Sequence, residues 1–219
     1  MRELVIIGNG SYAQMMRRYI QLTDFGVTVA YAVDEEHRTK RELDNLPVIT
    51  LKELTEKFPL EEISLIMGIG YTQMGNVRKR LFEECKRLGY CFSNYVHPTA
   101  IVQKNVTLGE GNNVLEGVIL EESVIVGNAN LFFGGSLVAH ESTIGDYNTL
   151  SVKAVVAGCT LIGRNCFIGA AATVRDHVRI NNYALIGAAA YADEDMEPYS
   201  VMVPAKGVVL EGRKSTEFL

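Results

Sequence analysis

The sequence predicts two parts: a Rossmann-like α/β domain over residues 1–95 and an all-β, left-handed parallel β-helix of hexapeptide repeats over residues 96–219. In the first part, short apolar runs alternate with helical patterns, which is typical of a small parallel α/β sheet. In the second part, a large apolar residue recurs at every sixth position. That period is the signature of a parallel β-helix.

The first part contains three apolar runs that predict strands, at residues 4–7, 27–33 and 63–67. Helical patterns cover residues 12–22 and 76–88, and Gly89 is placed to end the second helix. Thr50 and Glu53 have the spacing of a capping box, which predicts a short helix beginning there. Pro98 holds His97 in an extended conformation, so we expect the joint between the two parts near this pair.

The hexads of the second part predict a solenoid whose coils stack on one another. At three hexads per coil, the run gives about five coils. A β-sandwich is disfavoured because period-two alternation and hairpin turns are absent from the pattern. Small or compact residues precede most of the large ones by two positions and should fill the corners. The large apolar positions are Val102, Leu108, Val114, Leu120, Val126, Phe132, Val138, Ile144, Leu150, Val156, Ile162, Ile168, Val174, Ile180 and Ile186.

Composition excludes several classes of protein. The net charge of −5 disfavours a general affinity for nucleic acid. No apolar run has the length of a membrane span, and the N-terminus reaches a Gly-rich turn too soon for a signal peptide. The cysteines show no CxxC pair and no neighbouring His at metal-ligand spacing, which predicts reduced thiols in a cytoplasmic protein without a metal. Cys159 and Cys166 fall within the repeats, where small buried residues are expected.

A glycine turn links the first predicted strand to the first predicted helix. Gly8, Gly10 and Ala13 have a spacing that lets backbone N–H groups and the helix dipole receive a phosphate. Asp34 ends the second strand, where a dinucleotide-binding fold places its ribose-binding acid. The domain is too short for two mononucleotide-binding halves, so a nicotinamide dehydrogenase is disfavoured. The alternative is a turn that only packs a helix on the sheet.

His140 is the candidate catalytic residue among the four histidines. It is the third residue of its hexad, so its side chain should point away from the coil, and Glu141 follows it directly. Imidazole titrates near neutral pH and can accept a proton during attack, while an adjacent acid can orient the ring. We expect His97 to be structural, His37 to be solvated in a polar loop and His177 to be exposed at a repeat corner.

The chain resembles a known family over essentially its whole length. The similarity rests on four segments in this order: Gly8-Asn9-Gly10-Ser11, His97-Pro98, His140-Glu141 and Val203-Pro204-Ala205-Lys206. The family is that of the bacterial sialic-acid O-acetyltransferase-like sugar acetyltransferases, which includes N-acetyltransferases acting on nucleotide-linked 4-amino sugars.

The resemblance implies an acetyl-CoA-dependent acetyltransferase that N-acetylates a nucleotide-linked amino sugar in surface-polysaccharide or glycan biosynthesis. It also implies a homotrimer with the active site and the CoA groove between adjacent solenoids. O-acetylation of a sugar or sialic acid, and a catalytically inactive scaffold, are the alternatives. By this resemblance, the phosphates of the acceptor would be bound by Gly8, Gly10, Ser11 and Tyr12, and its nucleoside by Asp34 and Glu35. His140 and Glu141 would carry out catalysis. The backbone of Gly158 would be the oxyanion donor in the CoA groove, and Lys206 would contact CoA.

The sequence departs from the family pattern at several positions near the acceptor. Tyr12 stands where a His is frequent, Phe133 where an Asn is frequent, and Thr149 where a second His is frequent. Lys153 replaces a turn Gly, and Met202 replaces the Gly before Val203. These differences concern the identity of the sugar more than the solenoid or the donor.

Overall fold

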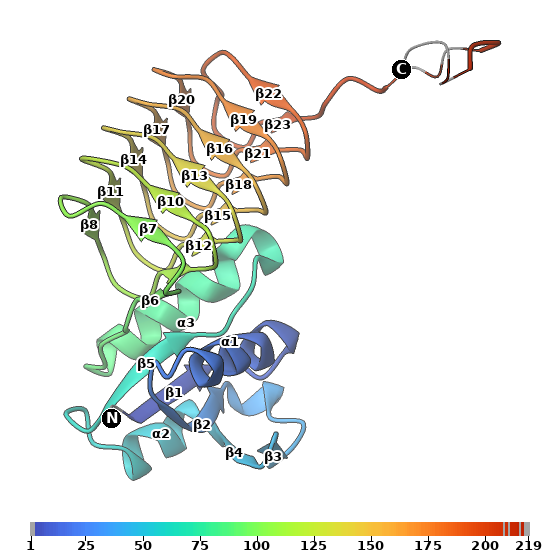
Figure 1. The fold of residues 1–219 in the computed structure, drawn as a ribbon. Helices are drawn as coiled ribbons and strands as arrows, with labels where there is room; N and C mark the ends of the chain where they lie inside the picture. Colours follow the sequence, from blue (N-terminus) through green and yellow to red (C-terminus); the bar gives the residue numbers. More distant parts are fainter. Residues whose placement is uncertain (1–2, 208, 210, 215, 217–219) are drawn as a thin grey trace.

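The chain folds into an α/β sheet domain followed by a long stack of short strands (Figure 1). The computed structural model describes residues 3–207, 209, 211–214 and 216. Within these residues, no helix has both the length and the apolar character needed to cross a membrane.

The N-terminal sheet has five strands in the order β3-β4-β2-β1-β5, all paired in parallel except β3 with β4. Thr50 and Glu53 form the predicted capping box. The sequence analysis missed β3 and β4, because in β4 only Val48, Ile49 and Thr50 are buried and Pro47 precedes them. The elements are β1 (Glu3–Ile7), α1 (Ser11–Leu22), β2 (Val27–Val33), η1 (Glu35–His37), β3 (Glu42–Leu43), β4 (Leu46–Thr50), α2 (Leu51–Lys57), β5 (Ile63–Met67), η2 (Thr72–Gly75) and α3 (Asn76–Arg87).

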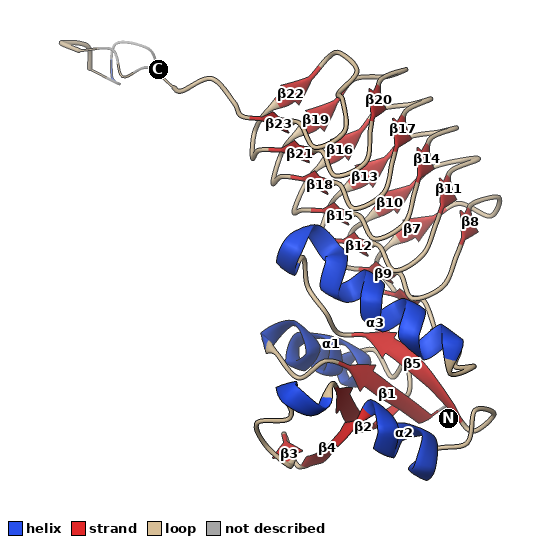
Figure 2. Cartoon of the chain, turned by 180° about the vertical axis from the view of Figure 1, so that it is seen from behind, coloured by secondary structure: helices blue, strands red, loops and turns tan. Residues whose placement is uncertain are grey.

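Alternate residues of the central strand β1 enter two different cores, as the pleat of a strand requires. Leu4 and Ile6 pack in the core that contains the buried face of α1. Val5 and Ile7 pack in the core that contains Leu81 of α3. Helices therefore cover both faces of the sheet (Figure 2).

The second part is a parallel β-helix with three faces, each a sheet of two-residue strands. The first face holds β7 (Ile101–Val102), β10 (Ile119–Leu120), β13 (Leu137–Val138), β16 (Val155–Val156), β19 (Thr173–Val174) and β22 (Tyr191–Ala192). The second holds β8 (Thr107–Leu108), β11 (Ile125–Val126), β14 (Thr143–Ile144), β17 (Leu161–Ile162) and β20 (Arg179–Ile180). The third holds β6 (Tyr95–Val96), β9 (Asn113–Val114), β12 (Leu131–Phe132), β15 (Thr149–Leu150), β18 (Phe167–Ile168), β21 (Leu185–Ile186) and β23 (Val201–Met202).

The hexad prediction is confirmed, since every one of the large apolar positions lies in the solenoid core or packs against it. Partner strands are 18 residues apart, as in Ile119, Leu137 and Val155, so one coil takes three hexads. The faces hold six, five and seven strands, so two of the three exceed the five per face expected. The difference arises because β6, β22 and β23 lie outside the run of hexads.

Inside one corner, asparagines of successive coils form a buried hydrogen-bonded ladder. The amide oxygen of Asn112 accepts hydrogen bonds from the backbone N–H (2.9 Å) and the side-chain amide (3.0 Å) of Asn130. Asn130 in turn accepts from the Asn148 N–H at 2.7 Å, and Asn148 accepts from the Cys166 N–H at 2.7 Å. The ladder satisfies backbone donors that the apolar core cannot, which explains why these small positions are polar yet fully buried.

Helix α3 lies between the sheet and the solenoid in both views (Figures 1 and 2). Its Arg78 is fully buried and donates to the carbonyl oxygens of Gly70 (2.6 Å), Ala129 (2.7 Å) and Tyr147 (2.6 Å). Burial lowers the pKa of Arg78 to about 10, so the guanidinium stays charged at neutral pH. Arg78 thus fastens the loop after β5 to two corners of the β-helix.

Candidate functional site

The candidate catalytic pair lies on a corner of the β-helix, just after β13. The His140 side chain is 57% exposed, as its place in the hexad predicted. Its Nδ1 lies 3.2 Å from Oε2 of Glu141, and its backbone N–H donates to Glu121 Oε2 at 3.0 Å. Glu141 has a φ of 56°, and this left-handed turn bends the chain so that both adjacent side chains face the same side. Glu141 therefore holds Nδ1, and Nε2 lies beside Gly158 of the next coil.

Gly158 lies beside His140 in the next coil, 18 residues along the chain. A Cβ at this position would lie 2.7 Å from Cε1 and Nε2 of the imidazole, so glycine lets the ring pack against the backbone where a side chain would displace it. In the described part of the chain, the Gly158 N–H donates no backbone hydrogen bond, whereas the next N–H, that of Cys159, donates to the His140 carbonyl at 2.9 Å. The corner thus combines an oriented imidazole with a neighbouring amide that the coil does not use.

Cys159 is not the core thiol that the repeat pattern predicted. It lies half-buried on a left-handed turn (φ 57°), with Sγ 3.8 Å from Oε2 of Glu141. Partial burial and the Glu141 carboxylate raise the pKa of the Cys159 thiol, so it remains protonated at neutral pH and is a poor nucleophile. Of the other cysteines, Cys85 and Cys166 are buried, whereas Cys91 is exposed.

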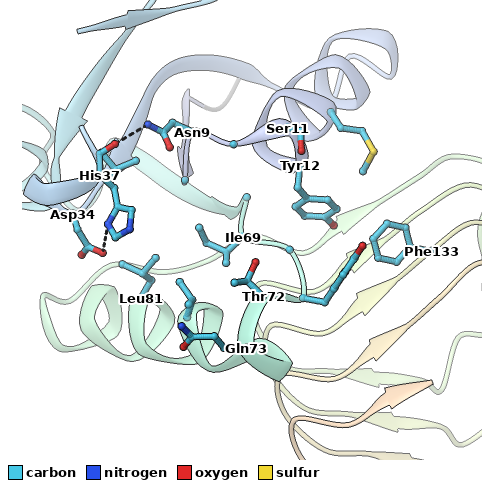
Figure 3. A pocket seen from close by; sticks show the side chains of 18 of the residues that line it. Asn9, Ser11, Tyr12, Asp34, His37, Ile69, Thr72, Gln73, Leu81 and Phe133 are labelled. Carbon is cyan, nitrogen blue, oxygen red and sulfur yellow. Dashed lines mark hydrogen bonds and ion pairs between the residues drawn. The ribbon is translucent and has the colours of Figure 1, made fainter. Parts of the chain in front are cut away.

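A separate cavity of about 830 Å³ opens above the carboxyl ends of β1 and β2 (Figure 3). The structure brings together Gly8, Gly10, Ser11, Tyr12 and Asp34 in its wall, as the sequence predicted. Gly8 has a φ of 111°, and a Cβ there would lie 2.7 Å from the Ile69 side chain. Gly10 precedes α1, and no side chain caps that helix, so its first N–H groups are open to an anion in the cavity.

Tyr12 and Phe133 close the cavity where the two parts of the chain meet. Their ring centroids are 5.8 Å apart, and the Tyr12 hydroxyl accepts a hydrogen bond from Nδ2 of Asn113 at 3.0 Å. Burial raises the pKa of Tyr12, which keeps its hydroxyl neutral. Phe133 and Asn113 come from the β-helix, so both parts contribute to the wall.

Asp34 is already paired with a residue that the sequence analysis did not predict. Arg80 of α3 donates two hydrogen bonds to the Asp34 carboxylate, at 2.6 and 3.1 Å, and they hold the pKa of Asp34 below its ordinary value. His37, expected to be simply solvated, lines the cavity with its Nδ1 3.5 Å from Asp34. Glu35 is exposed and does not line the cavity. His37 is three residues beyond Asp34 in the chain, whereas Arg80 reaches Asp34 only through the fold, and no sequence motif links either residue to it.

Two predicted residues lie away from this cavity. His140 lines a different, shallower depression with Lys104, Asn105 and Glu121. Lys206 is exposed on the extended chain that leaves the last coil, and that chain runs away from the solenoid (Figure 1). Within one chain, the candidate catalytic pair, the cavity and Lys206 are therefore three separate places.

These features define an α/β domain joined to a hexapeptide-repeat β-helix, with one open cavity and an exposed His–Glu pair. No protein-family model and no curated protein matches the sequence. A solved variant of perosamine N-acetyltransferase from Caulobacter crescentus, in complex with CoA and GDP-perosamine, is 24% identical, with 93% of this chain and 94% of that chain covered and a TM-score of 0.82. The acetyltransferase domain of PglB from Neisseria gonorrhoeae FA1090 is 21% identical over 95% and 100% of the two chains, with a TM-score of 0.81.

WeeI from Acinetobacter baumannii AYE is a more distant match, 15% identical over 88% of this chain and 94% of that chain, with a TM-score of 0.59. At these identities the matches establish the fold. The chain has the two-part architecture of sugar acetyltransferase structures over nearly its whole length, which confirms the predicted resemblance at the level of fold.

Proposed function

We propose that the protein is an acetyl-CoA-dependent acetyltransferase that N-acetylates a nucleotide-linked amino sugar in surface-polysaccharide or glycan biosynthesis. The observation that carries the proposal is the corner of His140, Glu141 and Gly158, where Glu141 pairs with the imidazole and the ring packs against the Gly158 backbone. An inactive scaffold has no need of that fit.

The hexad period and the 18-residue coil support a left-handed solenoid, and the glycine turn supports a Rossmann-like first domain over residues 1–95, with the solenoid domain over 96–219.

The geometry supports direct transfer of the acetyl group. Glu141 accepts a hydrogen bond from Nδ1–H of His140, which leaves the Nε2 lone pair free to accept a proton from the sugar amine as its nitrogen attacks the thioester carbon. The carbonyl oxygen becomes negative and accepts a hydrogen bond from the Gly158 N–H. When the C–S bond breaks, the imidazolium returns the proton to the departing sulfur. The protonated thiol of Cys159 argues against an acetyl-cysteine intermediate.

The cavity supports a nucleotide-linked acceptor. Amides at the start of α1 face the cavity, where they can bind phosphate, and Arg18 also lines it. Tyr12, Tyr71 and Phe133 provide apolar rings for the rest of the acceptor. The volume of about 830 Å³ is within the range of small-molecule sites. GDP-perosamine in the Caulobacter structure is an acceptor of this chemical class, bound in the same fold.

A homotrimer would bring the separate places together. The first face, which contains β7, β10, β13 and β16, has a column of outward-pointing aliphatic side chains, and His140 lies just after β13. In this column Ile101 is 52% exposed, whereas Ile119, Leu137 and Val155 are half-buried. An apolar column of this length normally packs against a partner. We infer that three chains pack along this face, so that the cavity of one chain meets His140 of its neighbour. Lys206 would then lie near the CoA groove between solenoids.

Release of free CoA thiol decides the proposal. Purified protein is incubated with acetyl-CoA and, one at a time, UDP-, dTDP- and GDP-linked amino sugars, with sialic acid as the O-acceptor contrast. We expect release with an amino-sugar nucleotide and an amide product by mass spectrometry. Release with sialic acid alone would establish O-acetylation instead. No release with any acceptor, from protein that binds acetyl-CoA, would contradict the proposal.

A further inference from the structure

The corner that holds His140 also places three different metal-ligating side chains together. One ligand atom each from His140, Glu141 and Cys159 lies within 4.8 Å of the other two. Oε2 of Glu141 is 3.2 Å from Nδ1 of His140 and 3.8 Å from Sγ of Cys159. Cys159 is 18 residues beyond Glu141, which is one coil of three hexads, so the coil stacking brings the two side chains together.

These distances fit a tetrahedral zinc ion. Zinc bonds of about 2.0–2.3 Å to nitrogen, oxygen and sulfur set neighbouring ligand atoms roughly 3.3–3.6 Å apart. Thiolate and imidazole together select zinc over magnesium or calcium. Each of the three side chains is at least partly exposed, so an ion can reach them from solvent.

The surrounding charge also favours a cation. The Glu121 carboxylate accepts the backbone N–H of His140, and Asp176 in the next coil acts electrostatically on the Cys159 thiol. The ion pairs at this corner involve only histidines, His140 with Glu141 and His177 with Asp176. Among the described residues, no lysine or arginine therefore forms an ion pair with these carboxylates.

We propose that His140, Glu141 and Cys159 form a zinc site that reversibly switches off the catalytic histidine. Binding releases the thiol proton to solvent and leaves the fourth position of the ion for water. Coordination through Nε2 occupies the lone pair of the base. Coordination through Nδ1 leaves the proton on Nε2, so that the ring can only donate. Either arrangement stops proton acceptance. The zinc site itself stands independently, while the inhibition rests on the proposed function.

Calorimetric titration of zinc into the untagged, chelator-treated full chain tests the site without any activity assay. We expect one zinc per chain, with affinity weakened at least about tenfold in Cys159→Ser and in Glu141→Gln, since even outer-shell partners contribute that much. Cys91→Ser is the matched control, because Cys91 is exposed but distant from the corner in the chain, and it should bind as the wild type does. Cobalt should show a thiolate charge-transfer band that Cys159→Ser lacks.

Zinc affinity in Cys159→Ser equal to that of the wild type would overturn the site. In the transfer assay, zinc should inhibit acetyl transfer by the wild type, and chelator should restore that activity. The Cys159→Ser variant, compared with its own rate without zinc, should not be inhibited. Binding at the corner without inhibition would overturn the switch. If no acceptor supports transfer, the proposed function fails, whereas calorimetry still decides whether the zinc site exists.

Discussion

At the scale of single residues, two neighbours, Glu141 and Gly158, set the position of the His140 imidazole. Glu141 holds one ring nitrogen at 3.2 Å, and Gly158 leaves space that any larger residue would fill. The sequence predicted the outward direction of His140 from its hexad position and the close approach of Gly158 from the resemblance. The approach of Cys159 to Glu141 was not predicted, because the repeat pattern placed Cys159 among the small buried residues, whereas it lies on a left-handed turn.

Replacing His140 by alanine should lower kcat by a factor on the order of 10²–10⁴, the usual cost of losing a general base. The melting temperature and acetyl-CoA binding should persist, because the side chain is exposed and supports no core contact. His177→Ala is the matched control: this histidine is 73% exposed at the same corner two coils further on and should keep its activity. An alanine variant of His140 with more than about a third of wild-type kcat would exclude this base.

Asp34 belongs to the acceptor cavity, so its loss should affect one substrate only. In Asp34→Asn the two hydrogen bonds from Arg80 weaken, and the cavity wall loses the negative charge of the Asp34 carboxylate. We expect a higher KM for the nucleotide-linked acceptor and a nearly unchanged KM for acetyl-CoA, measured by steady-state kinetics. Glu35→Gln is the control, since Glu35 is exposed outside the cavity wall. A change in acetyl-CoA affinity instead would mean that the sheet domain binds the donor.

At the scale of elements, the asparagine ladder is the polar counterpart of the apolar column inside the β-helix. Asn130→Ala would remove the acceptor of the Asn148 N–H and leave that buried donor unpaired. This should cost about 1–3 kcal/mol of the free energy of unfolding, measured by denaturant titration. Asn105→Ala is the control, because Asn105 is exposed and its hydrogen bonds compete with water, so its cost should stay within about 0.5 kcal/mol. Equal stability of the two variants would mean that water satisfies the ladder.

The elements differ in how far the sequence predicted them. The solenoid was predictable because each hexad must place one large apolar side chain in the interior of the coil, and this requirement does not depend on the rest of the protein. The helix at Leu51–Lys57 was predictable because its cap is local. Strands β3 and β4 were not, since their pairing at the edge of the sheet depends on tertiary contacts and only the end of β4 is buried. Arg80 and His37 were not predicted for the same reason, since the packing of α3 and η1 near β2 brings both of them to Asp34, and of the two only His37 lines the cavity.

At the scale of the whole molecule, the cavity and His140 lie in different places of one chain, and the proposed trimer would bring them together. The cavity wall comes from the sheet domain and from Phe133, whereas His140 lines another depression of the same chain. If the active site joins one chain's cavity to the neighbour's histidine, two differently inactive subunits should complement each other. Gly10→Trp is a suitable cavity variant, because Gly10 has an ordinary φ of −78° and no atom lies within 4 Å of its Cβ position.

We therefore predict that mixed trimers of His140→Ala and Gly10→Trp chains regain activity that neither variant shows alone. With equal and random mixing, an intact cavity meets an intact histidine at about a quarter of the sites, if each site joins two subunits of a cyclic trimer. The variants are unfolded and refolded together, their trimeric state is checked by light scattering, and thiol release is measured per site. Samples refolded separately and then combined are the control. A mixed trimer with no recovered activity would place the cavity and His140 of one site in the same chain, and a fully active monomer would remove the need for the trimer altogether.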